Sequence, residues 1–197
     1  MDGIVMQKIT QADYRIMPWK NGQGSTTELL VEPAGPGLDD FDWRISCATI
    51  QADGDFSNFR GVDRSLLILS GDGVNLNFNQ QVTLTLTPQS QALSFVGEDD
   101  VQAGLLDGAV TDFNVMTRRS RWLHALEKHT FERTLTLQMQ ADVSLIYHAG
   151  GGDVQFMIDD AHFPLSQNEL LRIESDAIEF KSEGQATLYV VYLNRRT

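Results

Sequence analysis

Residues 65–73 read Ser-Leu-Leu-Ile-Leu-Ser-Gly-Asp-Gly, and residues 144–152 repeat this apolar run and its glycine turn as Ser-Leu-Ile-Tyr-His-Ala-Gly-Gly-Gly. The offset between the two segments is 79 residues (144 − 65). A second pair follows in the same order, Val-Met-Thr-Arg-Arg at 115–119 and Tyr-Leu-Asn-Arg-Arg at 192–196, with an offset of 77 residues (192 − 115). Two matched pairs at nearly the same separation predict two copies of one small β unit.

The remaining apolar segments are short and alternate with polar residues. Residues 82–87 and 134–139 have a strict period of two, and residues 43–48 add branched and aromatic side chains to that pattern. Such runs, separated by glycine and proline turns, are typical of half-buried strands. Together with the repeat, they predict an all-β fold of two tandem antiparallel barrels, residues 1–121 and 122–197, packed together and able to exchange strands. Only residues 122–128 suggest a helix.

The composition limits the classes of partner. The chain has 197 residues, 42% of them hydrophobic, and a formal net charge of −12 from 27 acidic and 15 basic residues. Nucleic acids and anionic membranes attract basic surfaces, so neither is expected as a partner. A small anionic ligand remains compatible with a locally positive pocket, and exposed sheet edges are compatible with a homodimer.

The single cysteine, Cys47, cannot form an internal disulfide, which is typical of a reducing compartment. The first residues lack the basic and apolar stretches of a signal peptide. No apolar run approaches the roughly 20 residues of a membrane span. These features together predict a cytoplasmic protein.

Polar and aromatic residues gather in the first half. Residues 18–24 read Pro-Trp-Lys-Asn-Gly-Gln-Gly and place Trp19, Lys20 and Asn21 beside two glycines that allow close backbone approach. This segment would form either the mouth of a binding site or an ordinary surface turn with a packed tryptophan.

Two strands in the first half each have one polar face. Alternation places Arg44 and Ser46 on one face of residues 43–48, and Asp112 and Asn114 on one face of residues 112–118. These faces would either line a cavity or lie in solvent, and an isolated strand favours solvent for Arg44.

The segments 18–22, 43–46, 55–64 and 112–119, in this order and spacing, resemble the HutD/Ves family. The resemblance covers roughly residues 15–121. It implies a bicupin, that is, two tandem cupin-like antiparallel β-barrels of the jelly-roll type. It also implies binding of a small carboxylate or formyl-type metabolite, with a regulatory role in histidine utilisation or stress response.

Cupins that bind a metal typically carry His-x-His, then a glutamate, and a glycine seven residues after that glutamate. Gly71 fits this glycine, and Arg64 stands at the glutamate position (71 − 7). All four histidines lie after residue 121 and none forms His-x-His, so the first half lacks a set of metal ligands. An inward guanidinium instead favours a carboxylate ligand, or else a structural ion pair with Asp112 or Asp63.

The second half lacks these polar residues. Val143 stands at the position that corresponds to Arg64, and residues 187–193 are nearly all apolar. We expect a degenerate, structural barrel there. A metal site from His148, His162 and Glu169 has no supporting spacing.

The principal hypothesis is therefore a metal-independent, non-enzymatic protein that binds a small anionic metabolite without a cofactor. The expected ligand-binding residues are Trp19, Lys20, Asn21, Arg44, Ser46, Arg64, Asp112 and Asn114. The alternative is an isomerase or amide hydrolase, with Lys20 as general base and Asp112 as general acid.

Overall fold

The computed structural model describes residues 5–35, 40–158 and 161–197. These residues form β-strands joined by turns, with one 3-10 turn (η1, Gln11–Asp13) and no α-helix, so the all-β prediction is confirmed. They divide into two compact units. The first unit is Tyr14–Leu123, and the second is His124–Thr197 with the described part of Met1–Asp13.

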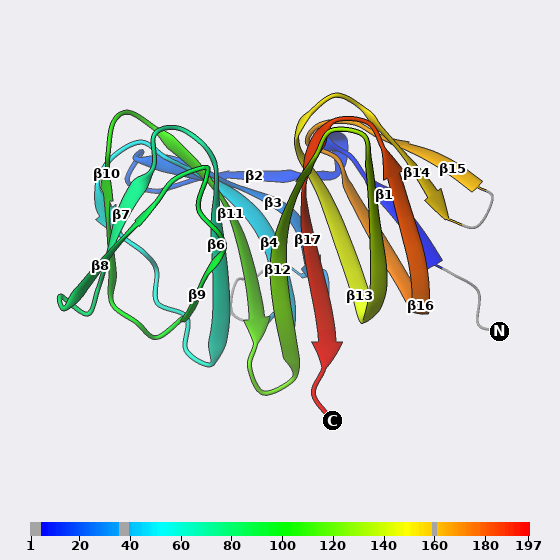
Figure 1. The fold of residues 1–197 in the computed structure, drawn as a ribbon. Helices are drawn as coiled ribbons and strands as arrows, with labels where there is room; N and C mark the ends of the chain where they lie inside the picture. The colour runs from blue at the N-terminus through cyan, green and yellow to red at the C-terminus, as the bar shows by residue number, and fades with distance from the viewer. Residues whose placement is uncertain (1–4, 36–39, 159–160) are drawn as a thin grey trace. The chain divides into compact units, whose positions relative to one another are not determined.

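Two antiparallel sheets form the first unit (Figure 1). The six-stranded sheet has the order β2 (Arg15–Pro18), β3 (Gly24–Glu32), β4 (Trp43–Ile50), β11 (Val110–Arg118), β6 (Val62–Ser70) and β9 (Leu93–Val96). The four-stranded sheet has the order β5 (Gly54–Asp55), β10 (Val101–Leu105), β7 (Val74–Phe78) and β8 (Val82–Leu86).

An apolar cluster fills part of the space between these sheets. It joins Leu66 and Ile68 on β6 to Val74 and Leu76 on β7, together with side chains of β8, β10 and β11. Both faces of β4 and β11 are buried. One face carries the apolar side chains Trp43, Ile45, Phe113 and Val115, and the opposite face carries the polar side chains Arg44, Ser46, Asp112 and Asn114. Both faces can be buried only if the polar residues of these strands lie inside the unit rather than in solvent.

The second unit is a seven-stranded antiparallel sheet. Its order is β12 (Trp122–Phe131), β17 (Ala186–Arg195), β13 (Thr134–Gly151), β16 (Leu170–Glu183), β14 (Val154–Ile158) and β15 (Ala161–Leu165), with β1 (Val5–Ile9) paired to β16. A large apolar cluster, including Phe156, Ile146 and Val190, forms its core. Within the described residues, no helix has the length and hydropathy that a membrane crossing requires.

Two sequence-based expectations differ from this structure. The division into 1–121 and 122–197 placed the N-terminal segment with the first half, whereas β1 pairs with β16 from Val5↔Glu174 to Ile9↔Leu170. The helix expected at residues 122–128 is wrong, because this segment is strand β12. The solvent accessibility of its side chains alternates along the chain, as in a strand. Its backbone N–H and C=O groups form hydrogen bonds with β17 instead of the hydrogen bonds they would form within a helix.

The internal repeat is visible in the strand registers. In the first unit Asn114 pairs with Leu66, and in the second Val191 pairs with Leu145. These positions differ by 77 (191 − 114) and 79 (145 − 66) residues, the offsets found in the sequence. The pairs β6–β11 and β13–β17 are therefore equivalent, which confirms the repeat.

Candidate functional site

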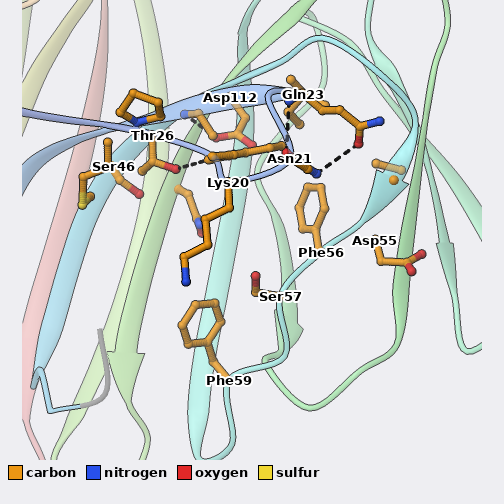
Figure 2. Close-up of a pocket in the computed structure, with 18 of the residues that line it drawn as sticks. Lys20, Asn21, Gln23, Thr26, Ser46, Asp55, Phe56, Ser57, Phe59 and Asp112 are labelled. Carbon is orange, nitrogen blue, oxygen red and sulfur yellow. Dashed lines mark hydrogen bonds between the residues drawn. The ribbon is translucent and has the colours of Figure 1, made fainter. Parts of the chain in front are cut away.

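The first unit contains a cavity of about 600 Å³ that is open to solvent. All eight residues predicted as ligand-binding line it: Trp19, Lys20, Asn21, Arg44, Ser46, Arg64, Asp112 and Asn114. Figure 2 shows several of them converging on it from the β2–β3 loop and from the strands. The cavity lies wholly within the first unit, as do all eight of these residues.

The register of three adjacent strands places the side chains of the cavity wall in rows that run across the sheet. Across β4, β11 and β6 the rows are Arg44–Met116–Arg64, then Ser46–Asn114–Leu66, then Ala48–Asp112–Ile68. Residues two apart on a strand share a face, so the side chains of these rows all lie on the face of the sheet that borders the cavity. The cavity wall thus changes from guanidinium groups, through a hydroxyl and an amide, to a carboxyl group.

Arg64 is the most unusual residue of the wall. It is only 5% exposed, yet its Nη1 donates one long hydrogen bond, 3.3 Å, to the Ser57 carbonyl, and its buried Nε has no acceptor. The structural ion pair considered from the sequence is absent from the described residues. Asp63 instead accepts from Arg119 at 2.6 Å, and Asp112 forms no ion pair with Arg64.

Three phenyl rings surround the Arg64 guanidinium in place of a counterion. The Cζ atom lies 5.2 Å, 5.7 Å and 5.0 Å from the ring centroids of Phe56, Phe59 and Phe95. Aromatic faces attract cations but neutralise no charge. Burial lowers the pKa of Arg64 to about 10, against the attraction of Asp112, so the group remains a cation at neutral pH.

Arg44 has a different environment. It is equally buried, but its Nε donates to Glu28 Oε2 at 2.6 Å in an ion pair whose two side chains are 6% and 12% exposed. Its cavity-facing orientation contradicts the solvent-facing alternative that an isolated strand favoured. Because Glu28 already neutralises Arg44, the unneutralised positive charge of the buried wall belongs to Arg64.

Asp112 is a buried carboxyl group without an ion-pair partner among the described residues. It is 2% exposed, and its Oδ1 accepts a hydrogen bond of 3.1 Å from the Ala48 backbone N–H. Burial raises its pKa to about 7, although Arg64 and the Ala48 N–H act in the opposite direction. Near neutral pH this side chain can therefore hold or release a proton.

The middle row presents neutral polar groups. Asn114 is 7% exposed and its buried Oδ1 has no hydrogen-bond donor, while Ser46 is 1% exposed on the neighbouring strand. A buried amide oxygen without a donor is costly unless a ligand or water supplies one. Asn114 is thus able to accept a hydrogen bond from a bound molecule.

The β2–β3 loop forms the mouth of the cavity. Gly22 has a φ of +71°, and a side chain at Gly24 would meet the Trp19 ring at 3.0 Å and collide with the Thr49 carbonyl. These glycines let the loop fold so that Trp19 Nε1 donates to Thr26 Oγ1 at 2.9 Å. The tryptophan is thereby fixed as part of the wall.

Lys20 and Asn21, the two polar residues of this loop predicted to bind the ligand, are both exposed but differ in their contacts. Asn21 accepts from the Gln23 backbone N–H at 3.0 Å and donates to the Gln23 side chain at 3.1 Å, so its amide organises the loop. In Figure 2 the Lys20 side chain extends from the loop in the direction of Phe59. Lys20 is the better placed of the two to meet a ligand.

The sequence did not predict which residues contact the side chains of Arg64 and Arg44. The rings of Phe56 and Phe59 lie within segment 55–64, which carried the family resemblance, but aromatic residues there gave no sign that they would enclose a cation. Phe95 and Glu28 gave no signal at all, because their contacts depend on strand pairing.

The residues present do not fit a divalent metal ion. In the part of the chain that the structure describes, no three His, Cys, Asp or Glu side chains converge. The cavity wall instead brings together Lys20, Arg44 and Arg64. In the second unit, His148 is buried and its Nε2 bonds to the Gly152 carbonyl at 2.8 Å, while His162 is exposed.

Comparison with known proteins places these features in a family. The HutD family model matches residues 11–190. An uncharacterized 21.2 kDa protein from the hutC 3′ region of Pseudomonas putida is 39% identical over 144 residues, 73% of this chain and 74% of that protein. The Ves protein of Citrobacter koseri is 42% identical over 113 residues, 55% of this chain and 58% of Ves.

Solved structures agree with this match. HutD from Pseudomonas fluorescens SBW25, determined in a formate condition, has a TM-score of 0.80 at 27% identity, covering 98% of this chain and 100% of that one. A cupin 2 conserved barrel domain protein from Leptotrichia buccalis has a TM-score of 0.55 at 11% identity, covering 87% and 88%. The second comparison shows a cupin-like fold only.

Proposed function

Because this chain belongs to the HutD/Ves family and has its cupin-like fold, we propose that its first unit binds a small carboxylate or formyl-type metabolite. The protein is then a bicupin in which the first barrel holds the ligand without a metal ion and the second barrel is structural. Binding, rather than turnover, is its primary activity.

One observation carries this proposal. The buried Arg64 cation has an unpartnered Nε and no carboxylate in ion-pair contact among the described residues, yet it borders a cavity large enough for a metabolite. A buried charge is costly until an opposite charge reaches it. A ligand carboxylate would supply that charge and could accept two parallel hydrogen bonds from the guanidinium.

The other wall residues would then recognise the remainder of the ligand. The Asn114 oxygen would accept from a donor group, Lys20 would approach from the mouth, and Trp19 would cover an apolar portion. The relatives support a role in metabolite sensing or buffering. One is encoded beside hutC, and a HutD structure was obtained with formate in the condition. We place this role in histidine utilisation or stress response.

Isothermal titration tests the proposal directly. The full chain is titrated with formate, N-formylglutamate, urocanate and glutamate, and at least one is expected to bind in a 1:1 ratio. Arg64→Gln should remove that binding, while Arg133→Gln, at an exposed arginine of the second unit, serves as the matched control. An absence of binding by all four compounds, or equal binding by the Arg64 variant, would contradict the proposal.

Asp112 supports a second candidate function. Its pKa of about 7 suits a group that donates and accepts protons near neutral pH, and it lines the same cavity as Arg64 and Lys20. This combination is compatible with an isomerase or amide hydrolase that acts on an anionic substrate. If the protein converts a ligand to a product, and if Asp112→Asn abolishes this turnover while the ligand still binds, the enzyme is favoured. If the ligand binds and is recovered chemically unchanged, the binding protein is favoured.

A further inference from the structure

We propose that binding of the anion is coupled to proton uptake, and that the proton binds to the carboxyl group of Asp112. This inference rests on the proposed function, since it concerns the same cavity and the same cation. It adds that affinity for the anion is regulated by pH in the neutral range.

The cavity wall contains one buried carboxyl group, Asp112, and a bound anion would share with it the positive charge of Arg64. Arg64 and Asp112 line the same cavity and lie two rows apart in the strand register, so one bound anion can act on both side chains. Asp112 accepts only the Ala48 N–H among the described residues and has no ion-pair partner. Its ionised form is therefore stabilised at a distance, chiefly by Arg64.

The other charged groups around the cavity do not replace Arg64 in this role. On β4, Arg44 is paired with Glu28 of β3 at 2.6 Å; its charge acts on Arg64, whose pKa it lowers, whereas Arg64 is the cation that lowers the pKa of Asp112. On the loops and β5, Lys20 and Asp55 are both exposed, and water screens their charges. The net charge inside the cavity is therefore set by Arg64, Asp112 and the anion that binds.

The direction of the coupling follows from this balance. Without a bound anion, the Arg64 charge lowers the pKa of Asp112 relative to burial alone. An anion that neutralises Arg64 removes this effect and adds a repulsive negative charge, so the pKa of Asp112 rises on binding. By linkage, protonated Asp112 favours the anion and ionised Asp112 disfavours it. The neutral carboxyl group can also donate a hydrogen bond to the ligand.

Formate is a suitable probe because it is a single carboxylate that stays ionised across the neutral range. Titrated at constant ionic strength, it should bind about sevenfold more weakly at about pH 8.5 than at about pH 6, which corresponds to a rise of about one pKa unit on binding from the free value of about 7. Near neutral pH, titration in two zwitterionic buffers with different ionisation enthalpies should show net proton uptake that peaks at about half a proton per formate.

Asp112→Asn removes the titrating proton but keeps an oxygen for the Ala48 N–H. This variant should bind formate with no pH dependence and no proton uptake. Asp72→Asn, at an exposed turn away from the cavity, is the matched control and should behave as the unmodified protein. The buffer comparison uses the unmodified protein, so it remains decisive even if the Asp112 variant fails to fold.

The outcomes separate this inference from the proposed function. Formate binding with a flat pH profile and no proton uptake would overturn the inference alone. A pH dependence that survives Asp112→Asn would overturn it as well, because another group would then hold the proton. No binding of formate at any pH would overturn the inference, and the same result with the other three carboxylates would overturn the proposed function too.

Discussion

Replacing Asp112 by asparagine should change how the stability of the free protein depends on pH. Asparagine has nearly the same shape and retains an acceptor for the Ala48 N–H, 3.1 Å away in the aspartate form. The carboxyl group has a pKa of about 7 in the fold, against 3.8 in its unperturbed state. The folded state therefore holds this proton over a range in which the unfolded chain has released it.

The magnitude follows from the two pKa values. The stability contributed by the neutral carboxyl group is fully present below the unfolded pKa of 3.8 and is lost as pH rises through the folded pKa of about 7. At alkaline pH the loss reaches ~4 kcal/mol. Between about pH 5.5 and about pH 8.5, Asp112→Asn should gain ~2 kcal/mol in the free energy of unfolding relative to the unmodified protein.

Urea unfolding followed by tryptophan fluorescence at several pH values measures this difference. All other titrating groups are shared by the two proteins, so their contributions cancel when the two stabilities are subtracted. A difference that stays constant within about 0.5 kcal/mol over this range would refute the reasoning, because a carboxyl group with an ordinary folded pKa gives no such slope. A difference that grows in the opposite direction would refute it equally.

Two further substitutions test the wall and the mouth of the cavity. Glu28→Gln leaves Arg44 as a second buried cation without a counterion, so the free energy of unfolding should fall by about 3 kcal/mol in chemical denaturation, while formate titration should show tighter binding. Gly24→Ala brings a methyl group to 3.0 Å from the Trp19 ring and into the Thr49 carbonyl, which should lower stability by about 2 kcal/mol and broaden the Trp19 indole signal in NMR spectra. Unchanged stability in either variant would contradict the contacts described.

The sequence predicted the cavity residues well because their positions depend on strand alternation. Arg44 and Ser46 share a face, as do Asp112 and Asn114, and the antiparallel registers bring both faces to one wall. The same local logic failed at residues 122–128. A short segment with mixed polar and apolar residues fits a helix or a strand, and only its pairing partner β17 decides between them.

The setting of each charged side chain could not be predicted in the same way. Glu28 meets Arg44 because β3 pairs with β4 through a register shift, and Phe95 meets Arg64 because β9 pairs with β6. Register shifts and long-range pairings leave little trace in a single sequence. Whether an inward arginine is neutralised or left with an unmatched charge is therefore information that only the three-dimensional structure supplies.

The internal repeat gives an independent reason to assign Arg64 to a ligand rather than to the fold. Arg64 pairs with Met116 on β11, and at the equivalent place in the second unit Val143 pairs with Leu193. Both Val143 and Leu193 are buried, so this backbone position folds well with aliphatic side chains. A purely structural arginine would also be expected to have a counterion such as the one Glu28 provides for Arg44. Arg64 lacks such a counterion, and it costs more to bury than the aliphatic side chain found at the equivalent position of the second unit. An anion bound in the cavity would explain why an arginine stands here and why it has no counterion.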